Sequence, residues 1–373
     1  MTIQLSLRLN NFIITHFLYL RFKKQTPFSR SLSLINKNKT MSKKLFILII
    51  LLYSSQLTKA QDKELEWLDI ELSNYHYPYT VSSLTLTIQK QQLKMAYMDI
   101  KPNNYNGKNI VLLHGKNFNG AYWKTTIIAL NKKGFRVIVP DQIGFGKSSK
   151  PNHFHYTFQQ LAQNTKTLLD SLKIYKTAVL GHSMGGMLAT RFALMYPKTT
   201  EKLILENPIG LEDWKIKVPY KPVEWWYKNE LKKNYKTIKK YQLESYYDNK
   251  WNPDYDQWVN LLAGWTLNSD YKTIAWNAAL TYDMIFTQPV VYEFGNISVP
   301  TLLIIGTRDR TALGKPLVSE QVRKTMGLYN ELGKKTQKSI PNAQLVELKN
   351  IGHLPHIENF DGFIKPLINF LKQ

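Results

Sequence analysis

Short runs of apolar residues recur along the chain, and segments with helical spacing separate them. The inner runs read as buried strands because they are almost entirely apolar. The runs cover residues 84–89, 92–100, 109–113, 136–139, 176–180, 202–206, 301–305 and 344–348. Amphipathic segments predict helices at 121–133, 158–172, 187–195 and 357–371. This alternation predicts an α/β fold with a mostly parallel, doubly wound sheet, whose first two strands form an antiparallel pair.

Residues 211–298 interrupt the alternation after the sixth predicted strand. They hold seven of the nine tryptophans and equal numbers of lysines and acidic residues, with no convincing apolar strand. We interpret this segment as a mostly helical cap over the carboxyl ends of the strands, where open α/β sheets bind ligands. Most of its aromatic residues are expected to fill the cap's own core, and a few to line a pocket. The core domain is then predicted to comprise residues 61–210 and 299–373.

Residues 41–60 carry the pattern of a signal peptide. A charged start at 41–44 precedes an apolar run at 45–52, and a small-residue cleavage site ends at Ala60. The apolar run is far shorter than the ~20 residues that span a bilayer. We therefore expect export to the periplasm or the extracellular space, with cleavage near Ala60 and no stable membrane span afterwards. Residues 1–40 would then be a misassigned extension, with an unusually long leader or a membrane anchor as the alternative.

The formal net charge of +23 resembles that of a nucleic-acid-binding protein. Ten basic residues and no acidic ones lie in residues 1–60, however, which leaves +13 for the remainder. Those charges are scattered among acids, with no long basic block outside 232–240, whereas a phosphate-binding surface needs a clustered patch. The absence of cysteine excludes disulfides, thiolate nucleophiles and cysteine-ligated metals. No His or Glu spacing indicates a metal site, and we expect no cofactor.

A Gly-x-Ser-x-Gly pattern lies between a predicted strand and a predicted helix. Ser183 at its centre would occupy a sharp turn that exposes Oγ at the carboxyl end of the sheet. Gly181 and Gly185 supply no Cβ to clash in such a turn. The first amides of the helix point at the same spot, so the N–H of Met184 is a candidate oxyanion donor.

Two other predicted strands end beside groups that would activate this serine. Asp309 follows the seventh strand and His353 the eighth, which gives the chain order expected when a nucleophile elbow lies on such a sheet. A serine hydroxyl needs an imidazole as general base, and the imidazole needs a carboxylate to orient it. We therefore predict a triad of Ser183, Asp309 and His353. Glu206 is a rival acid, and Asp213 is a weaker one.

A His-Gly-Lys-Asn motif follows the third predicted strand, from which such folds bring a second oxyanion donor. By position, the amide of Lys116 is the candidate, with Asn117 as a substitute. Three histidines are expected to be structural and not catalytic: His114, which begins this motif, His182 and His356. Of these, His182 is expected to pack beneath the turn that holds the serine.

The motifs together resemble the α/β-hydrolase superfamily, in its capped branch of meta-cleavage-product hydrolases, proline iminopeptidases, epoxide hydrolases and haloalkane dehalogenases. The resemblance covers roughly residues 85–373. It is carried by the His-Gly pair after the third strand, residues 140–148, the serine elbow, and the segments 306–309 and 352–355. A serine at position 183 separates the chain from the last two groups, which use aspartate there. The motifs are specific for the fold and weak for the substrate.

The expected activity is that of an exported serine hydrolase, which acts through an acyl-enzyme on a small to medium ester with apolar groups. One enzymatic alternative is carbon–carbon bond hydrolysis, which needs polar anchors for a carboxylate. Another is proline iminopeptidase action, which needs an acidic cluster; Glu224 and Glu230 are possible anchors but are expected to be solvated. A ligand receptor that retains the triad without turnover is the alternative of another class. The sequence indicates a small-molecule partner and leaves the oligomeric state open.

Overall fold

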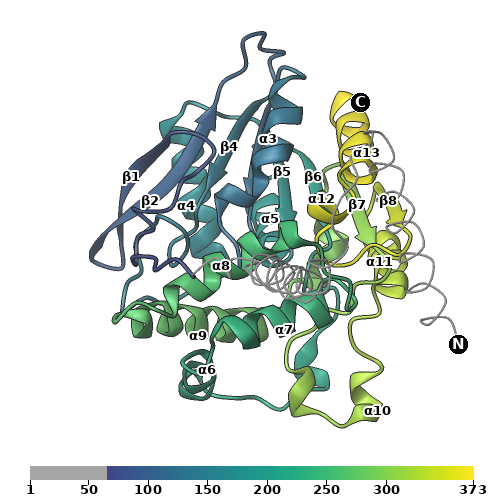
Figure 1. Cartoon of the computed structure of the whole chain (residues 1–373). Helices are drawn as coiled ribbons and strands as arrows, with labels where there is room; N and C mark the ends of the chain where they lie inside the picture. Colours follow the sequence, from purple (N-terminus) through teal and green to yellow (C-terminus); the bar gives the residue numbers. More distant parts are fainter. Residues whose placement is uncertain (1–64) are drawn as a thin grey trace, which may run out of the picture. The chain divides into compact units, whose positions relative to one another are not determined.

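One mixed sheet organises the molecule (Figure 1), and the computed structural model describes residues 65–373. The predicted signal peptide and the extension before it therefore lie outside the described residues. The strands have the order β1-β2-β4-β3-β5-β6-β7-β8. Their bounds are β1 (Val81–Ile88), β2 (Gln91–Ile100), β3 (Asn109–Leu113), β4 (Arg136–Pro140), β5 (Thr177–His182), β6 (Thr200–Glu206), β7 (Thr301–Gly306) and β8 (Ala343–Leu348). β2 is antiparallel to β1 and β4, and the other neighbours are parallel. The structure confirms the predicted fold class.

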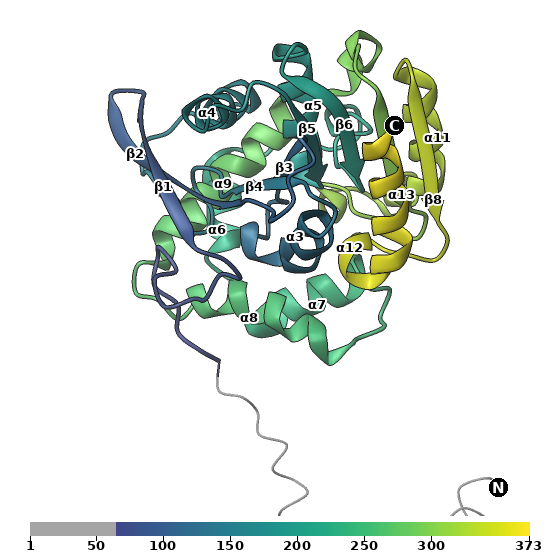
Figure 2. The ribbon, with the colours of Figure 1, turned by 90° about the horizontal axis from the view of Figure 1, so that it is seen from above.

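Helices cover both faces of the sheet (Figure 2). α4, α5 and α11 lie over one face, and α3 and α13 over the other. Outside the cap, the helical segments are η1 (Gly120–Trp123), α3 (Lys124–Asn131), α4 (Phe158–Ser171), α5 (Met184–Met195), η5 (Lys315–Leu317), α10 (Glu320–Arg323), α11 (Tyr329–Ser339), α12 (Pro355–Glu358) and α13 (Phe360–Lys372). Within residues 65–373, no helix is long and apolar enough to cross a membrane.

The inner strands feed two cores, one on each face of the sheet. Successive side chains of a strand point to opposite faces. In β7, Leu303 and Ile305 enter the core with α4, α5 and α11, whereas Leu302 and Ile304 enter the core with α3 and α13. All four side chains are buried. This two-sided burial is why the strands read as unbroken apolar runs instead of alternating patterns.

The C-terminal helix differs from the prediction, which placed one helix over 357–371. α12 ends at Glu358 and α13 begins at Phe360. Asn359 between them leaves the helical region with φ −143° and ψ 73°, and its side chain accepts a hydrogen bond from the Gly362 N–H. An asparagine that caps a helix in this way ends the preceding one. The single predicted helix is therefore wrong at this residue.

The cap lies between β6 and β7, and the structure confirms a helical insertion after the sixth strand. Its helical segments are η2 (Trp214–Ile216), α6 (Val223–Glu230), α7 (Tyr235–Ser245), η3 (Pro253–Tyr255), α8 (Asp256–Trp265), α9 (Tyr271–Thr287) and η4 (Val291–Asn296). The cap's own small core has the buried residues Ile238, Val259 and Ala263. Trp258 and Trp265 join the core beneath α3 and α13 instead. For these two residues the expected role of filling the cap's own core is wrong, because they attach the cap to the sheet domain.

Candidate active site

The loop between β5 and α5 holds Ser183 in a strained conformation. Its φ of 57° and ψ of −121° lie in a region that non-glycine residues rarely adopt. The Ser183 N–H donates to the carbonyl of Glu206 at 3.2 Å, and the Ser183 carbonyl accepts from the N–H groups of Gly186 at 2.9 Å and Ile209 at 3.1 Å. These bonds fix the strained residue from both sides. Such strain persists where the surroundings over-determine it, and it is typical of functional sites.

The glycines of the elbow allow the backbone to approach neighbouring segments closely. A Cβ on Gly181 would collide with the carbonyl of Gly185, and a Cβ on Gly185 would collide with the carbonyl of Leu113. Since both collisions involve backbone atoms, no side-chain movement relieves them. The turn therefore requires glycine at both positions, as the sequence pattern predicts.

The three predicted triad residues lie together. His353 Nε2 is 2.9 Å from Ser183 Oγ, and His353 Nδ1 is 2.7 Å from Asp309 Oδ2. Ser183 is 7% exposed, whereas His353 and Asp309 are buried. The serine follows β5, the aspartate follows β7 and the histidine follows β8, so all three come from the carboxyl edge of the parallel strands. This is the geometry in which an imidazole can accept the serine proton.

The carboxylate of Asp309 accepts hydrogen bonds on both oxygens. Oδ2 accepts from Asn207 Nδ2 at 2.7 Å as well as from His353, and Oδ1 accepts from the Thr311 N–H at 2.8 Å. Burial by itself raises the pKa of this carboxyl, but His353 and these donors together hold the pKa below its usual value. The aspartate therefore stays ionised and holds the proton of the imidazole on Nδ1.

Asn207 is a site residue that the sequence reasoning missed. It follows β6 directly and has a positive φ of 35°. Its Oδ1 accepts from the Gly306 N–H at 2.8 Å, while Nδ2 donates to the Gly352 carbonyl at 3.2 Å as well as to Asp309. One side chain thus joins the loops after three strands. The signal that identified Asp309, a polar residue just beyond a buried strand, was equally present here.

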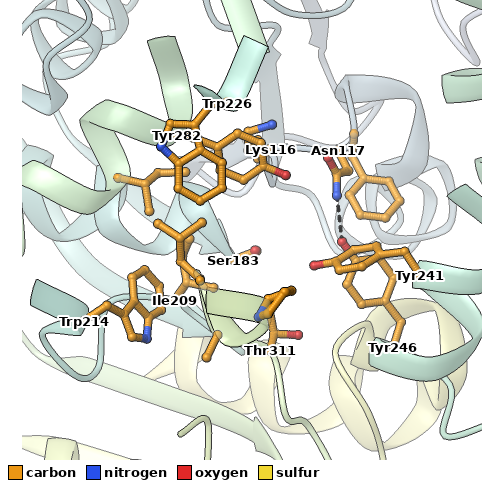
Figure 3. A pocket seen from close by; sticks show the side chains of 16 residues that line it. Lys116, Asn117, Ser183, Ile209, Trp214, Trp226, Tyr241, Tyr246, Tyr282 and Thr311 are labelled. Atoms are coloured by element: carbon orange, nitrogen blue, oxygen red, sulfur yellow. Dashed lines mark hydrogen bonds between the residues drawn. The ribbon is translucent and has the colours of Figure 1, made fainter. Parts of the chain in front are cut away.

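Tyr246, the residue after α7, brings the cap into contact with the triad. Its ring stacks on the ring of His353 with centroids 4.8 Å apart, and its carbonyl accepts from the His353 N–H at 3.4 Å. Its hydroxyl accepts from Asn117 Nδ2 at 2.9 Å (Figure 3). The sequence reasoning also missed this residue, because nothing in the sequence distinguishes it among the 22 tyrosines.

Three backbone N–H groups remain candidates for the oxyanion hole. In the part of the chain that the structure describes, the N–H groups of Met184, Lys116 and Asn117 donate to no protein acceptor. The N–H of Met184 opens α5 and so points out of the start of the helix. A Cβ built on Gly115 would lie 3.1 Å from the Cβ of Ser183, so the loop that carries Lys116 runs beside the serine. The choice between Lys116 and Asn117 as second donor stays a prediction.

A cavity of about 190 Å³ opens at Ser183 (Figure 3). The sheet domain and the cap both contribute to its wall. The lining residues are Lys116, Asn117, Phe118, Ser183, Ile209, Trp214, Trp226, Tyr241, Tyr246, Tyr282, Ile285, Thr311, Ala312, Leu313, Gly314 and Pro316. Five of the lining residues are aromatic residues of the cap, as expected for a pocket that binds apolar parts of a small molecule.

The rival acids do not contact the triad histidine. Glu206 Oε1 accepts from His356 Nδ1 and from the His356 N–H, both at 2.8 Å. Asp213 accepts from the Lys215 N–H and from the hydroxyl of Tyr292. His353 Nδ1 is therefore left to Asp309 alone among the carboxylates considered.

The two glutamates considered as cap anchors lie in different environments. Glu224 is exposed, as expected. Glu230 is 5% exposed, so the expectation that it is solvated is wrong. Lys233 Nζ lies 2.7 Å from Glu230 Oε1 and supplies the opposite charge that makes burial tolerable.

The histidines expected to be structural are buried and hydrogen-bonded. His114 Nε2 accepts from the Gln142 N–H at 3.0 Å. His182 Nε2 lies 2.8 Å from the carbonyl of His353, and His182 Nδ1 lies 3.1 Å from the hydroxyl of Tyr122. Across residues 65–373, no group of three His, Asp or Glu side chains gathers as a set of metal ligands.

Comparison with known proteins identifies the family. The family model of the α/β hydrolase fold matches residues 108–360. A 2-hydroxy-6-oxononadienedioate/2-hydroxy-6-oxononatrienedioate hydrolase from Comamonas testosteroni is 28% identical, with 71% of this chain and 88% of the relative covered. Lipase 1 from Psychrobacter immobilis is 26% identical, with 75% and 80% covered. The crystal structure of a probable hydrolytic enzyme from Pseudomonas aeruginosa is 47% identical with a TM-score of 0.82, and covers 83% of this chain and 99% of that one. The chain therefore belongs to the α/β hydrolase fold family and is a hydrolase of that family.

Proposed function

We propose that this chain is a serine hydrolase that cleaves small to medium esters through an acyl-enzyme. The observation that carries the proposal is the unbroken hydrogen-bonded path from Asp309 through His353 to Ser183, which ends at the wall of the cavity. Relatives named as lipases support an ester as substrate. The aromatic wall of the cavity suits an apolar acyl or alcohol part.

Acylation begins when Ser183 Oγ attacks the carbonyl carbon of the ester. His353 Nε2 takes the hydroxyl proton, and ionised Asp309 stabilises the resulting imidazolium through Nδ1–H. The N–H groups of Met184 and Lys116 hold the negative oxygen of the tetrahedral intermediate. His353 then returns the proton to the leaving alcohol as the carbon–oxygen bond breaks.

Deacylation repeats these steps with water as the nucleophile. His353 removes a proton from the water while the oxygen attacks the acyl carbon. Collapse of the second tetrahedral intermediate returns the proton to Ser183 Oγ and releases the acid. The same three side chains and the same two amides therefore serve both halves of the reaction.

Replacing the nucleophile tests this proposal. Ser183→Ala should lower kcat for short p-nitrophenyl esters by at least ~10³-fold, because no acyl-enzyme can form. Ser82→Ala, on the exposed part of β1, is the matched control and should keep wild-type activity. A fluorophosphonate should add one adduct to the wild type, seen as a mass increase, and none to Ser183→Ala. A labelled serine without turnover of any ester or diketone would favour the receptor alternative.

Carbon–carbon bond hydrolysis is the second candidate activity. The Comamonas relative is named as a hydrolase of a 2-hydroxy-6-oxo dienedioate, and it matches over most of its own length. The same triad would serve, with a carbon leaving group in place of the alcohol. Turnover of a vinylogous diketone with no activity on any ester would replace the ester proposal by this one.

Export of the mature chain is also part of the proposal. The charged, apolar and small-residue segments within residues 41–60 support cleavage after Ala60. N-terminal sequencing of the protein from the periplasm or the medium should read from Gln61. A mature protein that retains residues 45–52 would contradict cleavage.

A further inference from the structure

The ammonium group of Lys116, a residue that lines the cavity beside the nucleophile, has no ionic partner in the described part of the chain. Lys116 and Ser183 line the same cavity, and Nζ of Lys116 lies 3.5 Å from the centroid of the Tyr282 ring (Figure 3). Among the residues that the structure describes, no hydrogen bond or ion pair involves this Nζ. A cation–π contact lowers the cost of burial but supplies no counter-charge. Lys116 is thus a cation held at the site with its donors unused.

The surrounding charges leave one positive charge uncompensated. Glu230 at the end of α6 is the nearby buried acid, and it forms its ion pair with Lys233 at 2.7 Å. Lys116, Glu230 and Lys233 border a second, smaller cavity of about 40 Å³. Two lysines therefore border this cavity with one carboxylate, which within residues 65–373 pairs with Lys233 only. The sixteen residues around the main cavity include no acidic side chain, within the part of the chain that is described.

Partial burial without a partner makes the charged form of Lys116 unfavourable. It lowers the pKa of the ammonium to about 7, although Glu230 opposes the shift and Lys233 adds to it. Buried charges in proteins are ordinarily paired and hydrogen-bonded. An anionic group in the cavity would supply both the missing charge and acceptors for the three Nζ–H donors.

We propose that Lys116 binds a carboxylate of the substrate, so that the preferred substrates carry an anionic group close to the bond that Ser183 attacks. This inference rests on the proposed function and narrows it from esters in general to esters of short acids or alcohols that bear a free carboxylate. Lys116 then acts twice, since its backbone N–H faces the oxyanion and its side chain selects the substrate. The aromatic wall holds the carbon chain between the two polar ends.

Two pairs of matched esters test the proposal. The first pair is the p-nitrophenyl hemiester of glutaric acid and its uncharged carboxamide analogue, which places the charge on the acyl side. The second pair is the butyrate ester of p-hydroxybenzoate and that of p-hydroxybenzamide, which places the charge on the alcohol side. Wild-type kcat/KM should favour the carboxylate member of at least one pair by about 10- to 100-fold, the range expected for a hydrogen bond between charged groups.

Substitutions at position 116 should remove this preference. In Lys116→Met and Lys116→Gln the ratio of the two kcat/KM values should fall to about 3 or less, because the counter-charge is gone. Lys228→Met is the matched control, since it removes one positive charge from the exposed face of α6. That control should keep the wild-type ratio. A wild type without preference in either pair, or a Lys116→Met enzyme that keeps it, would overturn the inference while leaving the hydrolase proposal in place.

A binding measurement separates failure of this inference from failure of the proposed function. Glutarate should quench the fluorescence of Trp214 or Trp226, which line the cavity, and the effect should be lost in Lys116→Met. Suppose that glutarate binds the wild type but not Lys116→Met, and that the wild type hydrolyses no ester and takes no fluorophosphonate. That result would support the anion site and overturn the hydrolase. No glutarate binding together with no charge preference would overturn the anion site. Near-ultraviolet circular dichroism checks that each variant is folded.

Discussion

Two buried pairs of a carboxylate and an imidazole lie at the carboxyl edge of the sheet, and their surroundings differ. In the first, Asp309 Oδ2 and His353 Nδ1 are 2.7 Å apart. In the second, Glu206 Oε1 and His356 Nδ1 are 2.8 Å apart. The acids come from the ends of neighbouring strands, and both histidines come from the segment after β8. The surroundings therefore decide which of the two pairs is a candidate for catalysis.

The carboxylates differ in the number of donors that reach them. Asp309 accepts on both oxygens, and the pKa of this carboxyl lies below its usual value despite burial. Glu206 accepts only on Oε1, and Oε2 has no partner among residues 65–373. Burial raises the pKa of Glu206 to about 7, although His182 and the His356 N–H oppose the shift. The charge interaction with His353 and the donors on both oxygens, and not position at a strand end, keep Asp309 ionised.

The imidazoles differ in what their second nitrogen faces. His353 Nε2 faces Ser183 Oγ at 2.9 Å beside the cavity. His356 Nε2 has no partner in the described part of the chain, and the ring stacks on Trp123 with centroids 4.4 Å apart. Burial lowers the pKa of His356 to about 3, and His353 adds to this effect. We interpret the second pair as structural, because its imidazole stays neutral and meets no hydroxyl.

Replacing each histidine is the strongest test of this comparison. His353→Gln should lower kcat/KM for p-nitrophenyl butyrate by at least ~10³-fold, since no group remains to take the serine proton. His356→Gln should stay within about tenfold of wild type but lose about 1–3 kcal/mol in the free energy of unfolding, because packing against Trp123 is lost. Urea unfolding and initial rates measure both effects. Equal loss of activity in the two variants would show that the pairs act as one unit.

The acid partners should differ almost as strongly. Asp309→Asn should lower kcat by about 10³- to 10⁴-fold, because an amide can no longer hold the His353 proton on Nδ1. The new side-chain NH₂ at position 309 would also face the Asn207 Nδ2 donor, where the carboxylate oxygen of Asp309 accepts a hydrogen bond. Glu206→Gln is the matched change in the second pair and should keep kcat within about threefold. Rates at saturating ester distinguish the two, and a similar fall in both would remove the distinction between the acids.

The fold was predictable wherever burial alone determines the pattern. Strands buried on both faces leave continuous apolar runs, and each predicted strand has a counterpart in the sheet. α11 was not predicted, because Tyr329, Gly333 and Thr336 are its only buried residues, and lysines occupy much of the remainder. A helix that rests on the sheet by one narrow stripe has too few apolar positions to reveal its period.

The site was predictable where residues follow strands, and not where the cap meets the sheet domain. Ser183, Asp309 and His353 each follow a strand, so the sheet itself brings them together. Tyr246 and Glu230 depend on how the cap docks. In the sequence Glu230 and Lys233 look like a solvated pair, and only contact with distant parts of the chain buries Glu230.

Because of Glu206, the free energy of unfolding of the protein should fall as the pH rises. The pKa of Glu206 is raised to about 7 in the folded state, against an ordinary value of 4.5. Between these values the unfolded chain has lost the proton while the folded chain keeps it, so stability falls as the pH rises. Glu206→Gln removes this loss and should gain up to about 3 kcal/mol on wild type between pH 4.5 and pH 8. Urea unfolding at pH 4.5 and at pH 8 gives the difference in free energy of unfolding between Glu206→Gln and wild type, and comparing the two pH values cancels any constant cost of the amide. A difference that shrinks as the pH rises contradicts the assignment.

Asn207 sharpens the comparison, because it is the donor that the first carboxylate has and the second lacks. Asn207→Ala should lower kcat by about 10- to 100-fold, the effect of losing one hydrogen bond to a charged group. KM should change little, since Asn207 does not line the cavity. Asn342→Ala is the control for replacing an asparagine of positive φ, and it lies at the opposite end of β8. If Asn207→Ala lost no more kcat than this control, the donor to Asp309 would not be what separates the two pairs.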